Sequence, residues 1–452
     1  MDNALRDTDF DEEFDLTAAS SRAEADPAPE ATPPPDDAHE TPANDTTPDD
    51  FASDPGGARL IPAISILAFS ETDNVHEVLQ SLAADRRMAR ATMEIVPGGL
   101  DAAVSYLAEH PTPNLLILES TASGTDLVGQ IDRLAEHCED GVEVMVIGAV
   151  NDIRLYRQLM ARGVSEYIVP PVQPLQLYGS ISDLFTDPSQ PFLGKSIAVI
   201  GAKGGVGAST IAHNLAWSMA ENCGLNTTLV DLDLSFGTTA LDFNHDPQST
   251  VLDALLDPER ADDAVVERLI AKTTEKLSLF SAPATVANMP EVDPGAYAHV
   301  IETVRHNVPY VVLDLPHLWS SWVRDTLVAA DEIVIVCQPD LASLRNGKNL
   351  LDQLVAERAN DAPPRVILNM AGVPKRPEIP VNDFAAAMGT TPEEVIAFEP
   401  QLFGIASNNG QMLSEADPAS KASQALDRLA SILTGQHAEP RSKSLLQKLL
   451  GK

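Results

Sequence analysis

A glycine-rich segment near the middle of the chain has the residue types that bind a phosphate group. An apolar run, Ser196–Ile200, precedes the loop Gly201–Gly207, and a helical pattern comes next over Ile211–Met219. Glycines let backbone N–H groups approach phosphate oxygens, and the dipole at a helix N-terminus favours an anion. The hydroxyl of Ser209 has the position that such loops give to a ligand of Mg²⁺. The segment therefore predicts a nucleotide site, unless its glycines only let the strand pack closely on the helix.

The loop lacks one residue of the usual pattern. A standard phosphate loop has the form G-x-x-x-x-G-K-[ST], and Ala208 stands here in place of the lysine. Loss of a cation that clamps the transferred phosphate commonly lowers the rate about 10²- to 10³-fold. We therefore expect nucleotide binding with weak or slow hydrolysis.

Carboxylates come after two further apolar runs. Asp231 and Asp233 come after Thr227–Val230, and Asp314 comes after Tyr310–Leu313. A magnesium ion that bridges phosphates prefers oxygen ligands and needs its charge neutralised, so these residues are candidates for that role. Each of them taken alone could equally be a turn or cap residue.

The runs between these residues predict two α/β domains. In the second one, about 193–436, the expected strands are Ser196–Ile200, Thr227–Val230, Tyr310–Leu313, Glu332–Val336 and Val366–Leu368. In the first, 59–187, they are Ile64–Phe69, Met93–Val96, Asn114–Leu118, Val142–Ile147 and Glu166–Val169. Amphipathic stretches separate the runs of the first domain: Val75–Ala84, Leu100–Glu109, Leu127–His137 and Asp152–Ala161. Strands that alternate with helices favour doubly wound parallel sheets.

Length and charge limit the function further. The chain has 452 residues with 30 Lys+Arg against 67 Asp+Glu, a net charge of −37. Residues 1–58 hold 17 acidic and 2 basic residues and 8 prolines, which predicts a disordered acidic leader. The remaining 394 residues still have a net charge of −22, which disfavours binding to nucleic acid. Three scattered cysteines, with no secretion signal and no long apolar run, favour a cytoplasmic protein.

The order K-G-G-x-G in the loop resembles the deviant Walker A motif of the MinD/ParA family of dimerising ATPases. This resemblance covers residues 195–435 and implies ATP and Mg²⁺ as ligands. By resemblance, Lys203 reaches across a nucleotide-sandwich dimer, Asp233 positions the attacking water, and Ser209, Asp231 and Asp314 surround the metal. The implied nucleotide ligands are Gly204, Gly205, Val206, Gly207, Ala208, Ser209, Thr210, Asp340 and Asn369. Asn369 would read the base edge, although an asparagine that turns the chain at a strand end is an open alternative.

Within this family, the loop GAKGGVGAST and the segment Phe398–Met412 look like the CpaE/TadZ proteins of Tad (Flp) pilus assembly. The resemblance implies a localisation or assembly factor that recruits a separate secretion ATPase, an inner-membrane platform or a polar landmark. A DNA- or cargo-partitioning ATPase of the ParA type is the alternative, and the acidic balance counts against it. A receiver that gates an ATPase is a third interpretation.

The first domain resembles a phosphorelay receiver that has lost its chemistry. A receiver needs an aspartate after the third strand and a lysine after the fifth, and this chain has Glu119 and Pro170 there. We therefore expect a degenerate receiver that serves in docking or localisation, with Glu119 as an ordinary carboxylate at a strand end.

Residues 441–452 are a basic tail with four leucines. In a helix, Leu445, Leu446, Leu449 and Leu450 would form one apolar face, flanked by lysines, which suits an anionic membrane.

Deleting 441–452 should therefore reduce co-sedimentation of the protein with anionic liposomes in the presence of ATP. If binding is unchanged, the tail packs on its own domain or does nothing at the membrane.

Overall fold

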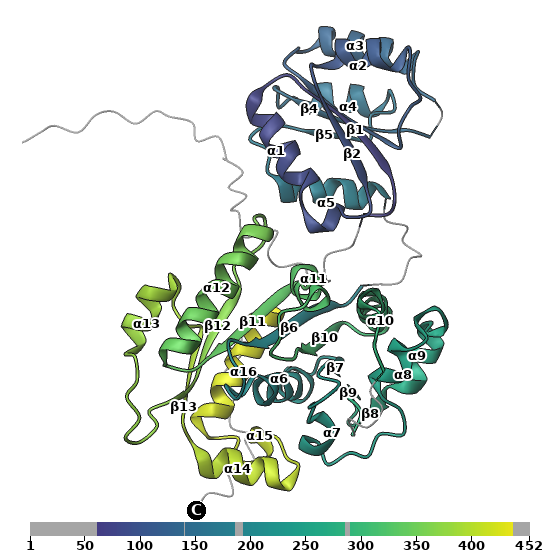
Figure 1. Ribbon diagram of the computed structural model, residues 1–452. Coiled ribbons are helices and arrows are strands. Elements are labelled where there is room, and N and C mark those ends of the chain that lie inside the picture. Colours follow the sequence, from purple (N-terminus) through teal and green to yellow (C-terminus); the bar gives the residue numbers. More distant parts are fainter. Residues whose placement is uncertain (1–60, 140, 186–192, 285–289, 437–452) are drawn as a thin grey trace, which may run out of the picture. The chain divides into compact units, whose positions relative to one another are not determined.

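The computed structural model describes residues 61–139, 141–185, 193–284 and 290–436 (Figure 1). All of them belong to one compact unit of the chain, Pro48–Lys452. Our predictions for the leader 1–58 and the tail 441–452 lie outside the described residues. No helix of the described residues is both long and apolar enough to span a membrane.

The first sheet has five parallel strands in the order β2-β1-β3-β4-β5. Its elements are β1 (Ser65–Ser70), α1 (Asp73–Ala83), the 3₁₀ turn η2 (Arg86–Met88), β2 (Thr92–Pro97), α2 (Leu100–Leu107), β3 (Leu115–Ser120), α3 (Thr125–Ala135), β4 (Glu143–Gly148), α4 (Ile153–Met160), β5 (Glu166–Ile168) and α5 (Pro174–Phe185). Helices α2, α3 and α4 cover one face, and α1 and α5 cover the other. The predicted doubly wound arrangement is confirmed, and α5 was not predicted.

The second sheet has eight strands in the order β13-β12-β11-β6-β10-β7-β9-β8, and only the β8–β9 pair is antiparallel. Its first elements are β6 (Lys195–Gly201), α6 (Ala208–Trp217), the π-helical turn η3 (Ser218–Asn222), β7 (Thr227–Asp231), α7 (Thr239–Asp242), α8 (Val251–Leu255), the 3₁₀ turn η4 (Pro258–Arg260), α9 (Asp263–Leu269), β8 (Ala271–Lys272) and β9 (Leu277–Phe280). The later ones are α10 (Pro294–Asn307), β10 (Tyr310–Asp314), α11 (Ser321–Ala329), β11 (Glu332–Cys337), α12 (Leu341–Glu357), β12 (Arg365–Ala371), α13 (Val381–Met388), β13 (Glu394–Ala397), α14 (Pro400–Asn409), α15 (Leu413–Ala416) and α16 (Lys421–Thr434).

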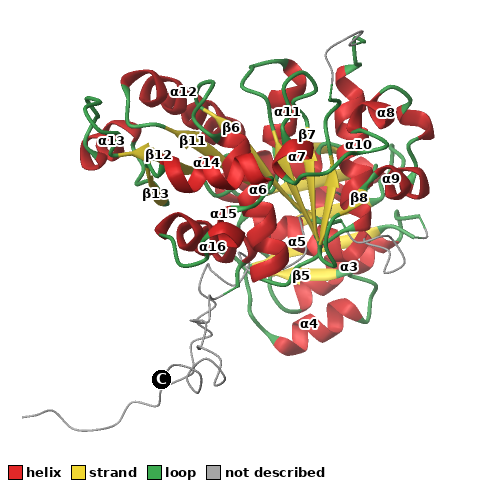
Figure 2. Cartoon of the chain, turned by 90° about the horizontal axis from the view of Figure 1, so that it is seen from below, coloured by secondary structure: helices red, strands yellow, loops and turns green. Residues whose placement is uncertain are grey.

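Helices cover both faces of this second sheet (Figure 2). Helices α6 and α16 pack on one face, where Leu215 and Leu429 are fully buried. Helices α8 to α13 pack on the other face, where Val304, Leu327 and Phe384 are fully buried. Burial on both sides explains why the central strands are almost wholly apolar. All five predicted strands of this sheet are confirmed, and the α/β fold class with them.

The topology gathers the predicted site residues at one edge of the second sheet. Strand β6 lies between β10 and β11, with β7 beyond β10, and all four strands run parallel. Their carboxyl ends therefore meet at the same edge, which is where open parallel sheets bind ligands. The loop after β6 and the carboxylates at the ends of β7 and β10 lie at this edge.

Candidate functional site

The loop between β6 and α6 has a backbone that favours glycine. Gly205 and Gly207 have positive φ angles of 77° and 86°, a conformation that costs most other residues about 1–2 kcal/mol. A Cβ atom on Gly207 would also lie 2.6 Å from Nδ2 of Asn369. The chain turns here directly into α6, whose first N–H groups have no partner within the helix.

Three side-chain amides hold the carbonyl groups of this loop. Asn346 Nδ2 donates to the Ala202 carbonyl at 3.0 Å. Gln338 Nε2 donates to Gly205 at 3.1 Å, and Asn369 Nδ2 donates to Val206 at 2.8 Å. These bonds satisfy the loop's acceptors from outside and leave its N–H groups to an anion. The amide nitrogen of Asn369 thus binds the loop, a contact that sequence reasoning missed.

The only lysine of the loop is paired within its own chain. Lys203 Nζ lies 2.6 Å from Oδ2 of Asp340, and Asp340 caps α12 by accepting a hydrogen bond from Ser343 N at 2.8 Å. Burial opposes ionisation, but the Lys203 ammonium and the cap bonds keep the pKa of Asp340 below its ordinary value. Asp340, the predicted nucleotide ligand, is therefore the ion-pair partner of Lys203. Lys203 could contact the nucleotide of a second subunit, as predicted, only after this ion pair breaks.

The position of the missing lysine is the first residue of α6. The side chain of Ala208 packs against the apolar cluster beneath the helix. Ser209 and Thr210 complete the first turn, so the predicted phosphate ligands Gly204–Thr210 form one continuous segment. Without a lysine at residue 208, an anion bound here depends on backbone N–H groups and on cations from elsewhere.

Asp231 and Asp314 end neighbouring strands and are both fully buried. Asp231 accepts hydrogen bonds from the N–H groups of Asp233 and Thr239, at 3.1 and 3.2 Å. Oδ1 of Asp314 accepts no hydrogen bond from the described residues, and Oδ2 has only an ion-pair contact. Burial, and then the charge of Asp314, raise the pKa of Asp231 to about 7. An oxygen-rich pair with one carboxylate oxygen, Asp314 Oδ1, left without a donor fits the neighbourhood of a magnesium ion.

A buried histidine, which sequence reasoning missed, completes this cluster. His213 Nδ1 lies 2.8 Å from Oδ2 of Asp242, and its Nε2 lies 3.3 Å from Oδ2 of Asp314. Burial alone would lower the pKa of His213, but the two carboxylates raise it to about 10. The ring is therefore a cation that partly neutralises the buried acids. A histidine inside the mostly apolar helical stretch Ile211–Met219 was the available signal.

Asp233, the predicted water-positioning residue, lies in the turn after β7. Its Oδ1 accepts a hydrogen bond from Phe236 N at 3.0 Å, and its carbonyl accepts one from Gly237 N at 2.7 Å. The structure thus gives Asp233 a turn-capping role. Its catalytic role stays a prediction.

A cavity of about 290 Å³ opens beside the loop. It joins the start of α6 to the strand end that bears Asn369 and to the segment before α14. Among its lining residues are Gly207, Thr210, Asn214, Asn369, Phe398 and Phe403. Aromatic and amide side chains next to a phosphate loop suit a purine base. Phe398 and Phe403 belong to the segment Phe398–Met412, whose sequence resembles that of the CpaE/TadZ proteins.

The receiver-like sheet has a site of a different kind. Glu119 is buried and accepts hydrogen bonds from Glu71 N, Thr72 N and Thr72 Oγ1, at 2.6, 2.8 and 2.6 Å. The neighbouring Glu71 accepts two more from Thr121 N and Oγ1, at 2.8 and 2.7 Å. Glu119 lies at the end of β3, as expected, and its hydrogen bonds also fix the loop before α1.

The buried cluster around His213 predicts how stability depends on pH. Both folded pKa values exceed their unfolded values of about 6.5 for histidine and 3.9 for aspartate. Each contribution is complete below the unfolded pKa and is lost as the pH rises through the folded one. We expect the free energy of unfolding to fall from about pH 4 to 7 through Asp231 and from about pH 6.5 to 10 through His213.

Urea unfolding at a series of pH values measures this effect. His213→Gln should flatten the fall on the alkaline side, whereas His299→Gln, an exposed residue of α10, should leave it unchanged. An undiminished alkaline fall in His213→Gln would contradict the assignment.

The chain has relatives among known proteins. A family model described as an AAA domain matches residues 194–361. The pilus assembly protein CpaE of Caulobacter crescentus is 43% identical, over 28% of this chain and 98% of that one, with a TM-score of 0.28. The sporulation initiation inhibitor Soj of Bacillus subtilis is 30% identical, over 37% of this chain and 68% of its own length.

The septum site-determining protein MinD of Bacillus subtilis is 21% identical over 266 residues, which are 57% of this chain and 97% of the relative. The regions aligned to CpaE and Soj make up 98% and 68% of those two proteins. By these identities the chain belongs to the CpaE family of pilus assembly proteins, within the MinD/ParA superfamily.

Proposed function

We propose that this chain is an ATP-binding, dimerising localisation or assembly factor of a Tad-type pilus system, with weak or slow ATP hydrolysis. The observation that carries the proposal is the loop before α6. Its glycines and the three amides that hold its carbonyls suit a phosphate, while Ala208 supplies no charge. Such a site favours binding of a triphosphate over its rapid cleavage.

Different groups of residues would bind the phosphates, the base and the metal ion of the nucleotide. The N–H groups of Gly204–Thr210 would bind the phosphates, and the cavity beside Asn369 would hold the base. Ser209, Asp231 and Asp314 would hold Mg²⁺, which supplies charge neutralisation at the phosphates when bound. His213 already neutralises part of the acidic charge below the loop.

Exposed apolar side chains support the proposal of a dimer. Phe236, Trp319 and Leu341 come after the carboxyl ends of β7, β10 and β11, and are 79%, 50% and 73% exposed. These strands end at the edge that holds the phosphate loop, and Leu341 directly follows Asp340, the partner of Lys203. Large apolar side chains at one edge are typical of a surface that another protein covers. A second copy would bring its Lys203 to this edge.

Membership in a pilus assembly family supports the cellular part of the proposal. The partners we propose are the pilus secretion ATPase and an inner-membrane platform or polar landmark, reached from the cytoplasm. Binding of specific nucleic acid is not part of this proposal, because the net charge is −37.

Variants at the loop test the proposal. With Mg²⁺ and ATP, we expect the full chain to bind nucleotide in calorimetry and to dimerise in light scattering. Lys203→Ala should stay monomeric, whereas Lys348→Ala, which breaks a surface ion pair with Asp352, should behave as wild type.

Ala208→Lys should raise the rate of ATP hydrolysis by about 10²- to 10³-fold, because it restores the cation that contacts the transferred phosphate.

Two outcomes would count against it. If Lys203→Ala dimerises with ATP as wild type does, the lysine does not act across a dimer. If Ala208→Lys binds ATP but hydrolyses it no faster, the missing lysine is not what limits hydrolysis.

A further inference from the structure

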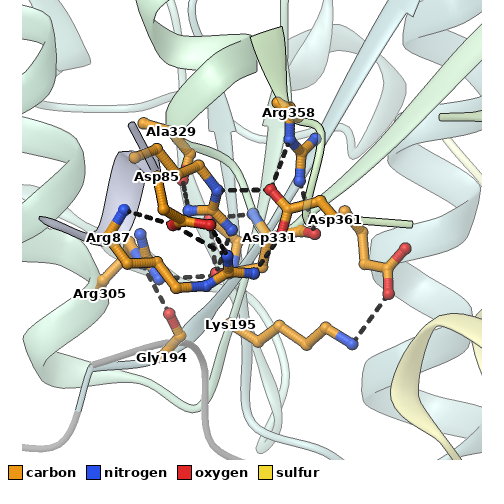
Figure 3. Close-up of polar contacts among 12 residues, drawn as sticks. Asp85, Arg87, Gly194, Lys195, Arg305, Ala329, Asp331, Arg358 and Asp361 are labelled. Atoms are coloured by element: carbon orange, nitrogen blue, oxygen red, sulfur yellow. Dashed lines mark hydrogen bonds and ion pairs between the residues drawn. The ribbon is translucent and has the colours of Figure 1, made fainter. Parts of the chain in front are cut away.

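A buried network of ion pairs joins the receiver-like sheet to the second sheet (Figure 3). Arg86, in the turn η2, lies 2.9 Å from Asp361 and 3.4 Å from Asp331, and it donates to the Ala329 carbonyl at 2.8 Å. The adjacent Arg87 pairs with Asp361 as well. Each of these charged side chains is at most 10% exposed. Two neighbouring arginines of the first sheet thus share two aspartates of the second.

The same two aspartates are also bound from within the second sheet. Asp331 lies 2.6 Å from Nη2 of Arg305 and accepts hydrogen bonds from Ser196 N and Oγ, at 2.8 and 3.0 Å. Asp361 lies 3.0 Å from Nε of Arg358. Burial opposes ionisation, but Arg305 and Arg86 lower the pKa of Asp331. The aspartates are charged, and each is bound by arginines from both sheets.

Neutral and exposed contacts surround this ionic centre. Ser81 Oγ donates to Asn360 Oδ1 at 3.0 Å, and Asn360 Nδ2 donates back to the Ser81 carbonyl at 3.2 Å. At the solvent-exposed rim, Arg90 Nη2 lies 2.6 Å from Oε1 of Glu302. The guanidinium of Arg87 also lies 5.4 Å from the ring centre of Tyr178 on α5. The hydrogen bonds and ion pairs that cross to the second sheet all come, on the first-sheet side, from the segment 81–90, and Tyr178 packs behind Arg87.

These contacts form a matched interface. A buried charge that loses its partner is strongly destabilising, so such a network selects one partner and one register. Every arginine here has a carboxylate within reach, and the aspartates come from the loops that precede β11 and β12. Since the strands are parallel, those loops lie at the edge where β6 and β11 begin. The phosphate loop lies at the other end of β6.

We propose that the receiver-like domain (residues 61–185) is an intrachain partner of the domain that holds the phosphate loop (residues 193–436). It docks through segment 81–90 onto the edge where the strands of the second sheet begin. The η2 segment is therefore occupied by this chain's own aspartates and is not a free surface for another protein. The opposite edge, with the phosphate loop, stays open to nucleotide and to a second copy. This inference does not depend on nucleotide binding, so it stands or falls separately from the proposed function.

An engineered disulfide in the full chain tests the docking without nucleotide. Ser81→Cys combined with Asn360→Cys should form an intramolecular cross-link on mild oxidation, seen as a shift on a non-reducing gel and as a linked peptide in mass spectrometry. Ser105→Cys with Asn360→Cys is the matched control, because Ser105 is exposed on α2, which covers the other face of the first sheet. The control pair should not link.

A charge reversal at the exposed rim then tests the register. Arg90→Glu should slow cross-linking of the 81–360 pair about two- to fivefold, and Arg90→Glu with Glu302→Arg should restore the rate. Arg133→Glu, which breaks an exposed ion pair with Asp101 within the receiver-like domain, should leave the cross-linking rate unchanged. Because Arg90 and Arg133 are half exposed, neither variant should prevent folding. Linking no faster than the control pair, or a rate indifferent to Arg90→Glu, would overturn the proposal.

Discussion

The nucleotide site depends on three hydrogen bonds that side-chain amides donate to the loop before α6. They come from α12 and from the ends of β11 and β12, and they fix a loop whose glycines have positive φ angles. The amides satisfy the carbonyl groups, so the N–H groups are left for an anion. This arrangement is made by the backbone and does not need a lysine at residue 208. It explains how a loop can keep the shape of a phosphate site after losing its main cation.

Internal neutralisation of buried charge recurs elsewhere in the molecule. His213 lies between Asp242 and Asp314, and four arginines surround Asp331 and Asp361. Glu119, in contrast, is satisfied by backbone and hydroxyl donors. Burying a charge without a partner is costly. In each case the chain supplies its own counter-charge or donors, so these sites hold their geometry before any ligand arrives.

Local patterns in the sequence predicted most of the strands and the phosphate loop. Short apolar runs between amphipathic stretches identified ten parallel strands, because strands covered on both faces have almost no polar residues. The positions of Asp231 and Asp314 were predicted because each directly ends such a run. Strands β9 and β13 were missed. Each has four residues, and in β13 only Ile396 is buried, so no apolar run marks it in the sequence. Strand β13 also lies at the edge of its sheet, and the outer neighbour of β9 is the two-residue strand β8.

Contacts between distant residues could not be predicted in this way. Asp242 reaches His213 from 29 residues away, and Arg86 reaches Asp361 from 275 residues away. Neither pair has a periodicity or a motif. The pairing of Lys203 with Asp340 was also unforeseen, although both residues were singled out, because the family resemblance assigned Lys203 to the phosphates of a partner subunit and Asp340 to the nucleotide. Where a side chain binds depends on topology, which a single sequence specifies only indirectly.

Calorimetric titration of ATP into the full chain, in the presence of Mg²⁺, tests the central claim most directly. If the amide-held loop retains a triphosphate without a lysine at residue 208, the titration should give a saturable heat with one nucleotide bound per chain. A chain that binds no adenine nucleotide even at millimolar concentrations would contradict the claim and leave the loop as a structural turn.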